Sequence, residues 1–244
     1  MPTKTDKNKP KDVVEQQPVS LPQYSLLFQL EDVVVNGRKV AFDVLKKLLA
    51  EHKVDFNIGT FSRHCLYSMP KQYISELVEV IGNRKITAEK LTEEMEKEWA
   101  AELERSAKLS GPFGKILQMG QDKAYSVGFV SALPEELANT LFNKLGLGDT
   151  GAKLFTFKDA EKVFPGPDIW LKAAKGLPQK PRNCGVLAGH MTACKSALSA
   201  DMRCVVVPDE FTSFQDYSGA RAVVESLDEI SAKELFEVFF PNMK

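Results

Sequence analysis

The chain has 244 residues, enough for one large domain or for a core domain with a smaller inserted one, and we favour the second arrangement. Its 32 basic and 33 acidic residues leave a net charge of -1, which argues against nucleic acid and anionic membranes as partners. No apolar run approaches the ~20 residues of a membrane span, and the N-terminus lacks an apolar secretory segment, so we predict a cytoplasmic protein.

The N-terminal segment and the cysteines complete this general description. Residues 1–22 are rich in Lys, Asp, Gln and Pro, and with little apolar content they cannot offset their own ordering entropy, so we predict a flexible tail. The four cysteines, Cys65, Cys184, Cys194 and Cys204, show no C-x-x-C pairing. They are predicted to be reduced, buried thiols.

The apolar run that begins at Ser25 predicts a buried strand, and it stops at the polar residues Gln29 and Glu31. Open α/β sheets usually place their chemistry at the carboxyl ends of the strands. The residue at this position is an amide, which cannot serve as a nucleophilic carboxylate. Whether another group replaces it decides what the site can do.

Residues 39–108 are predicted to form a helical cap inserted after this strand. Apolar residues recur at helical spacing over 40–49 and again over 73–81. Thr87 can cap a third helix, which carries an apolar stripe every four residues. The stripe consists of Leu91, Met95, Trp99 and Leu103.

From residue 110 onward, strand and helix patterns alternate. Strands are predicted over 125–130, 154–157, 184–187, 204–207 and 222–224, and helices lie between them, with Gly146 as one helix stop. Repeated βα units predict an α/β fold, a Rossmann-like, mainly parallel sheet with helices on both faces. The core would comprise 23–38 and 109–244, with the all-α cap between them.

Three segments of the C-terminal half, 164–174, 181–187 and 197–203, resemble the haloacid dehalogenase-like superfamily, in particular its phosphoglucomutase-like and phosphatase-like branch with a helical cap. The resemblance spans about residues 24–232. Members of that superfamily use a carboxylate nucleophile, an acid/base carboxylate two residues later, a Ser or Thr, a Lys, and acidic residues that hold magnesium. The matching positions here are Gln29, Glu31, Ser131, Phe164, Ala188 and Gly189.

Of these positions only Ser131 is unchanged from what the resemblance implies, since Glu31 keeps a carboxylate but is one methylene longer than the superfamily's Asp. Gln29 cannot form an aspartyl-phosphate, and Ala188 and Gly189 offer no anionic oxygen to magnesium. Phe164 removes the cation that would stabilise the transferred group. We therefore expect a catalytically inactive pseudoenzyme without a cofactor, a scaffold that binds another protein or a small ligand.

Two other functions remain open. The chain could be a hydrolase or phosphatase of a small phosphorylated substrate, with a rearranged site around Glu31, Asp32, Ser131 and Lys162, and magnesium would be expected only then. It could also be a structural subunit anchored by residues 1–22. For Asp32 we favour a turn residue bonded to local backbone over a relocated carboxylate, and for Lys162 an ordinary surface residue.

Two histidines and one helix start are weaker candidates. His190 lies at the edge of the site but lacks the neighbours of a metal ligand. His64, beside Ser62 and Cys65, suggests a nucleophile, yet we favour an ordinary cap helix. Ser131 and Ala132, with the helix that follows Pro134, are predicted to bind an anion weakly.

Overall fold

The structure, a computed structural model, describes residues 23–66, 69–157, 164 and 166–241. The predicted tail over 1–22 and the candidate Lys162 lie outside the described residues. Within the described part of the chain, no helix has the length and apolar character needed to cross a membrane. All four cysteines are free and buried, as predicted.

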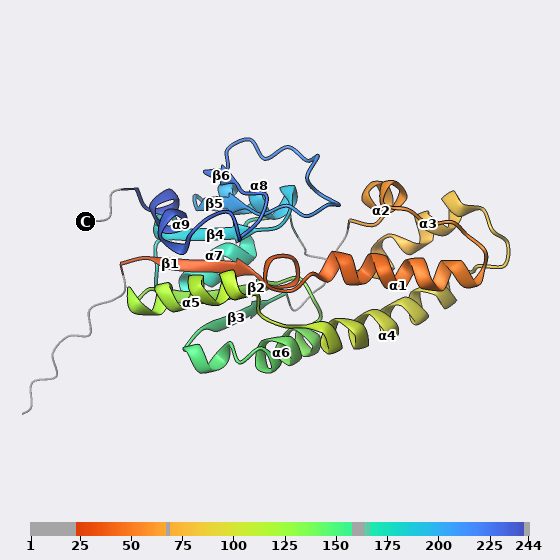
Figure 1. The fold of residues 1–244 in the computed structure, drawn as a ribbon, viewed down its shortest axis with the longest axis horizontal. Helices are drawn as coiled ribbons and strands as arrows, with labels where there is room; N and C mark the ends of the chain where they lie inside the picture. The colour runs from red at the N-terminus through yellow and green to blue at the C-terminus, as the bar shows by residue number, and fades with distance from the viewer. Residues whose placement is uncertain (1–22, 67–68, 158–163, 165, 242–244) are drawn as a thin grey trace, which may run out of the picture.

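Six strands form one parallel sheet in the order β3-β2-β1-β4-β5-β6, which confirms the predicted Rossmann-like fold. Figure 1 shows β1 inside the sheet, with its carboxyl end directed toward the cap. The strands are β1 (Ser25–Gln29), β2 (Ser126–Ser131), β3 (Lys153–Thr156), β4 (Cys184–Ala188), β5 (Arg203–Val206) and β6 (Ala222–Val223).

Helices cover both faces of the sheet, because alternate side chains of β1 point in opposite directions. Leu26 and Phe28 belong to one buried cluster and Leu27 to the other. The first cluster is covered by α5 (Gly111–Asp122), α6 (Glu135–Lys144) and α9 (Ala232–Phe239). The second is covered by α7 (Asp168–Gly176) and α8 (Met191–Ser199).

Four helices form the cap beyond the carboxyl end of β1 (Figure 1). They are α1 (Gly37–Glu51), α2 (Ile58–His64), α3 (Ile74–Ile81) and α4 (Ala88–Ser106). The predicted stripe on α4 is buried along its whole length, and α4 packs against α1 and α3. The structure therefore confirms the inserted all-α cap.

One aromatic side chain from the core is inserted into the cap. Phe211 follows β5 and is fully buried. Its ring centroid lies 4.9 Å from that of Phe61 and 5.4 Å from that of Phe42, both on cap helices. Aromatic pairs at these separations add to the free energy of burial. This contact fixes the cap against the edge of the sheet where the candidate site lies.

Candidate active site

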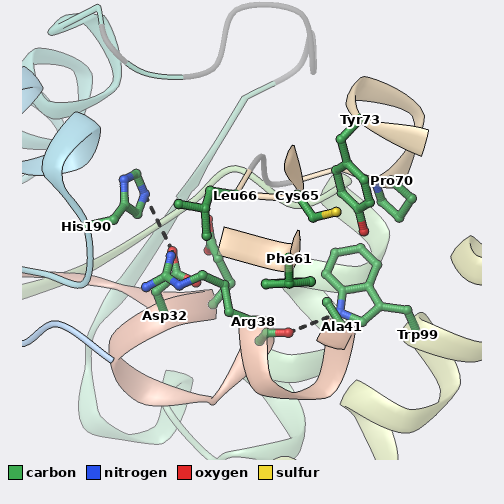
Figure 2. Close-up of a pocket in the computed structure, with 12 residues that line it drawn as sticks. Asp32, Arg38, Ala41, Phe61, Cys65, Leu66, Pro70, Tyr73, Trp99 and His190 are labelled. Atoms are coloured by element: carbon green, nitrogen blue, oxygen red, sulfur yellow. Dashed lines mark hydrogen bonds and ion pairs between the residues drawn. The ribbon is translucent and has the colours of Figure 1, made fainter. Parts of the chain in front are cut away.

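A narrow cavity lies between the carboxyl end of β1 and the cap (Figure 2). Its free volume of about 20 Å³ is close to what one ordered water molecule requires. A larger molecule therefore has to displace cap side chains to enter. The walls include Glu31 and Asp32 from the turn after β1, Arg38 from the start of α1, and His190 from the start of α8. The other cap residues in the walls are Phe61, Cys65, Tyr73 and Trp99.

A π-helical turn, η1 (Leu30–Val34), follows β1 directly and carries the two acidic residues of the cavity. The turn is held close to the start of α1. A Cβ atom on Gly37 would lie 2.4 Å from the backbone oxygen of Glu31, so only glycine fits this approach. The wide turn places Glu31 and Asp32 side by side at the cavity.

The amide of Gln29 is fully occupied by hydrogen bonds. Its Oε1 accepts from the Gly189 N–H at 3.0 Å, and its Nε2 donates to Asp32 Oδ2 at 2.5 Å. The same Nε2 lies 2.9 Å from Nε2 of His190. The amide group thus joins three neighbours that a carboxylate at this position could not satisfy together.

The contacts of His190 call for opposite tautomers. Since Gln29 Nε2 is a donor, its 2.9 Å contact favours an accepting Nε2 and places the ring proton on Nδ1, which lies 2.6 Å from Thr192 Oγ1. The Ala193 N–H donates to Nδ1 at 3.3 Å, which favours a proton on Nε2 instead, 3.5 Å from Asp32 Oδ2. Burial and then the charge of Arg38 hold the pKa of His190 well below its usual range. The imidazole is therefore neutral.

Asp32 is bound by side chains and not by local backbone, so our preference for a simple turn residue was wrong. Its Oδ2 accepts from Gln29 and pairs with Nη1 of Arg38 at 2.8 Å. Burial raises the pKa of Asp32, while the charge of Arg38 opposes that rise. Oδ1 has no hydrogen-bond partner among the described residues. The carboxylate is thus held at one oxygen and available at the other.

Glu31 is the second carboxyl group of the cavity and is almost fully buried. Its Oε1 accepts from the Ala132 N–H at 2.8 Å, and its Oε2 is buried without a partner in the described part of the chain. Burial, and then repulsion from Asp32, raise the pKa of Glu31 to about 7. A carboxyl group with this pKa can donate and recover a proton near neutral pH.

The remaining positions of the superfamily pattern line the same edge of the sheet. Ala188 ends β4 and is buried, and Gly189 follows it. The ring of Phe164 stacks on Trp170 and meets His190 edge to face, with centroids 5.7 Å and 5.6 Å apart. Phe164 thus supplies an apolar wall beside His190 where the resemblance implies a lysine.

The anion site expected at Ser131 and Ala132 stays a prediction. A side chain of the protein itself already occupies one of its hydrogen-bond donors. Ser131 is fully buried and its Oγ accepts from the Leu133 N–H at 3.2 Å. The Ala132 N–H is bound to Glu31. An anion at this position would therefore have to displace an internal carboxyl group.

The hypothesis of a nucleophile beside His64 gains no support from the geometry. Nδ1 of His64 lies 2.9 Å from Oε1 of Glu76, on the neighbouring cap helix. Burial raises the pKa of the Cys65 thiol to about 12, which keeps it protonated. His64 is a cap residue, as we preferred.

Sequence reasoning missed Arg38 and Asp209. Nε of Arg38 donates to Asp209 Oδ2 at 2.6 Å, across 171 residues of sequence, and its Nη2 donates to the Gly189 oxygen at 2.8 Å. The guanidinium is buried. No motif or spacing in the sequence connects these residues, because the fold alone brings them together.

The chain is similar in sequence to several curated proteins. No family model matches the chain. The putative phosphatase YhcW of Bacillus subtilis (strain 168) is 25% identical over 196 residues, which are 79% of this chain and 88% of that protein. Protein CbbY of Rhodobacter capsulatus is 28% identical over 120 residues, 49% of this chain and 48% of that protein.

Solved structures of other proteins are similar to this chain in fold. β-Phosphoglucomutase from Clostridium difficile superposes with a TM-score of 0.69 at 19% identity, covering 90% of this chain and 97% of that one. A conserved haloacid dehalogenase-like protein of unknown function from Agrobacterium tumefaciens gives 0.71 at 21% identity, covering 86% and 96%.

These comparisons contradict the expectation of a catalytically inactive scaffold. A relative that covers most of this chain is named as a putative phosphatase, and structures with this fold include enzymes. The expectation rested on the loss of single motif residues. It ranked Asp32 as a relocated carboxylate below a turn residue and missed Arg38, and both residues line the same cavity.

Proposed function

We propose that this chain is a haloacid dehalogenase-like protein of the phosphoglucomutase-like and phosphatase-like branch and that it hydrolyses a small phosphate monoester at a rearranged active site. One observation carries the proposal. Two carboxyl groups line one cavity at the carboxyl end of β1: Glu31 is buried, and the side chain of Asp32 is 7% exposed. Paired carboxyl groups of this kind serve as proton donor and nucleophile in many hydrolases.

In the proposed reaction Asp32 takes the place of the missing nucleophile. Oδ1 of Asp32 forms a bond to phosphorus, and the bond from phosphorus to the alcohol oxygen breaks. The departing oxygen takes the proton of Glu31. A water molecule then gives its proton back to Glu31 and attacks phosphorus, which releases inorganic phosphate and frees Asp32. Gln29 and Arg38 hold Oδ2 of Asp32, so that Oδ1 faces the cavity.

The net charge and the free cysteines of the chain support a small substrate in the cytoplasm. The net charge of -1 offers no attraction to nucleic acid or membrane surfaces. Four free, buried cysteines suit a reducing compartment. We therefore take a small phosphorylated metabolite as the partner of the site.

The test is phosphate release from p-nitrophenyl phosphate and a panel of sugar phosphates by the full chain. We expect hydrolysis that Asp32→Asn abolishes, and we expect the exposed Asp149→Asn to keep the activity of the unmodified protein. Borohydride added during turnover should reduce an acyl phosphate at Asp32, which mass spectrometry of the peptide detects. No release from any ester, with or without magnesium, would refute the proposal, and so would full activity in Asp32→Asn.

A further inference from the structure

The superfamily resemblance implies magnesium at this edge of the sheet, and the residues present do not fit it. Ala188 and Gly189 offer no side-chain oxygen, and Gln29 offers one neutral oxygen that already accepts from Gly189. In the part of the chain that the structure describes, no three His, Cys, Asp or Glu residues are placed to hold a metal.

The space for the missing carboxylate is also filled. A Cβ atom on Gly189 would lie 2.7 Å from the Cβ of Asp32 and 3.0 Å from Nη2 of Arg38. Any side chain at 189 therefore excludes the present arrangement of Asp32 and Arg38. The chain therefore has a carboxylate at position 32, and position 189, where the resemblance implies an acidic residue, has no side chain.

A guanidinium group lies where the acidic residues converge. Nη1 of Arg38 pairs with Asp32 at 2.8 Å, Nε with Asp209 at 2.6 Å, and Nη2 donates to the backbone oxygen of Gly189 at 2.8 Å. The side chain is only 8% exposed. Of the five guanidinium N–H groups, these three contacts leave one on each terminal nitrogen without a partner among the described residues. Arg38 also lines the cavity, so its guanidinium is placed beside any anion that binds there.

We propose that Arg38 is a resident cation that takes the place of the divalent metal, so that phosphate binding and hydrolysis at this site need no metal. The proposal rests on the proposed function for its hydrolytic part only. An arginine is charged at every pH at which the protein is folded, and its planar group binds phosphoryl oxygens through paired N–H donors. It would stabilise the charge that develops on the transferred group, as a metal does elsewhere.

Asp32 and Asp209 keep this cation in place. Burial alone would lower the pKa of Arg38, but the two carboxylates raise it above its usual value. A chelator can remove a bound metal ion, but it cannot remove this cation, because Arg38 is part of α1. The charge is present whenever the cap and core are packed together.

The experiment compares turnover and phosphate binding with EDTA and with magnesium chloride. We expect p-nitrophenyl phosphate hydrolysis to agree within about twofold in the two conditions. Calorimetric titration with magnesium alone should give no binding, and inorganic phosphate should bind in EDTA. Turnover that requires magnesium, or phosphate that binds only with magnesium, would overturn the role of Arg38 and leave the hydrolase proposal standing.

Variants at Arg38 provide the second test. Arg38→Met should lower kcat/KM by about 10²-fold or more and abolish phosphate binding in EDTA. Arg38→Lys, which keeps the charge but not the planar group, should restore part of both. Arg105→Met is the matched control, because the guanidinium of Arg105 is exposed and pairs with Glu102 away from the cavity, and the variant should behave as the unmodified protein.

The outcomes separate the two proposals. If no variant and no condition shows turnover, the hydrolase proposal fails, while phosphate binding still tests Arg38. Phosphate binding that is unchanged in a folded Arg38→Met protein, as judged by circular dichroism, would overturn the assignment of the cation.

Discussion

The side-chain amide of Gln29 donates to the carboxylate of Asp32 across 2.5 Å, at the point where β1 ends. The superfamily resemblance implies a carboxylate at 29, and such a group would face Asp32 as a like charge. The amide therefore fits this chain because Asp32 is present. The amide at position 29 and the carboxylate at position 32 both depart from the superfamily pattern, and their hydrogen bond couples them. A substitution at one of them therefore tests both.

Gln29→Asp should destabilise the protein by about 3 kcal/mol near neutral pH, because it brings two buried carboxylates together and removes the donor to His190. The loss should shrink in mild acid, where one carboxyl group of the pair is protonated. Urea denaturation at two pH values measures both effects. Gln118→Asp is the control: Gln118 also donates to an aspartate, Asp122, but on the exposed face of α5. Equal losses for the two variants would contradict the coupling.

Gly189→Ala should cost about 1–3 kcal/mol, since the added methyl group would meet the Cβ of Asp32 at 2.7 Å and the guanidinium of Arg38. The same change at Gly114, on α5, meets no atom within 4 Å. There it should stabilise slightly, by about 0.4–1 kcal/mol, because alanine favours the helix. Thermal denaturation compares the two. A tolerated alanine at 189 would show that the approach of Asp32 is not needed for folding.

Phe211→Ala should reduce stability by about 3–5 kcal/mol, because the side chain is fully buried between cap and core. Phe214→Ala, in the same segment, removes a side chain that is 67% exposed and should change stability by less than about 0.5 kcal/mol. Differential scanning calorimetry of both variants gives the comparison. Similar melting temperatures for the two would mean that Phe211 does not hold the cap.

Most of the fold could be predicted because its signals are local. The apolar stripe of α4 has helical spacing, and burial of Leu91, Met95, Trp99 and Leu103 follows from it. Gly146 has a φ of +65°, the left-handed conformation that a predicted helix stop requires. Each of these features depends on residues within a few positions of one another.

The site could be predicted only in part, because its contacts join distant parts of the chain. The amide at Gln29 and the carboxyl at Glu31 are visible in the sequence. The direction of Asp32 depends on the π-helical turn, and the ion pair of Arg38 with Asp209 spans 171 residues. The motif positions alone predicted a site without charged groups, whereas the folded chain places the charged side chains of Asp32 and Arg38 at the cavity.

The raised pKa of Glu31 predicts how stability depends on pH. The pKa is about 7 in the folded protein against a usual 4.5, so between these values the folded state keeps a proton that the unfolded state has released. The free energy of unfolding should therefore fall as pH rises through this window, by on the order of 3 kcal/mol, and this contribution should be constant above it.

Glu31→Gln isolates that contribution, because the amide resembles the protonated carboxyl group and does not titrate. We expect the variant to match the unmodified protein at about pH 5 and to exceed it in stability at about pH 8. Glu229→Gln, at an exposed position, should follow the unmodified protein at both values. Urea midpoints across this range provide the measurement. Parallel curves for Glu31→Gln and the unmodified protein would mean that Glu31 is ionised in the folded state and cannot donate the proton that the proposed reaction requires.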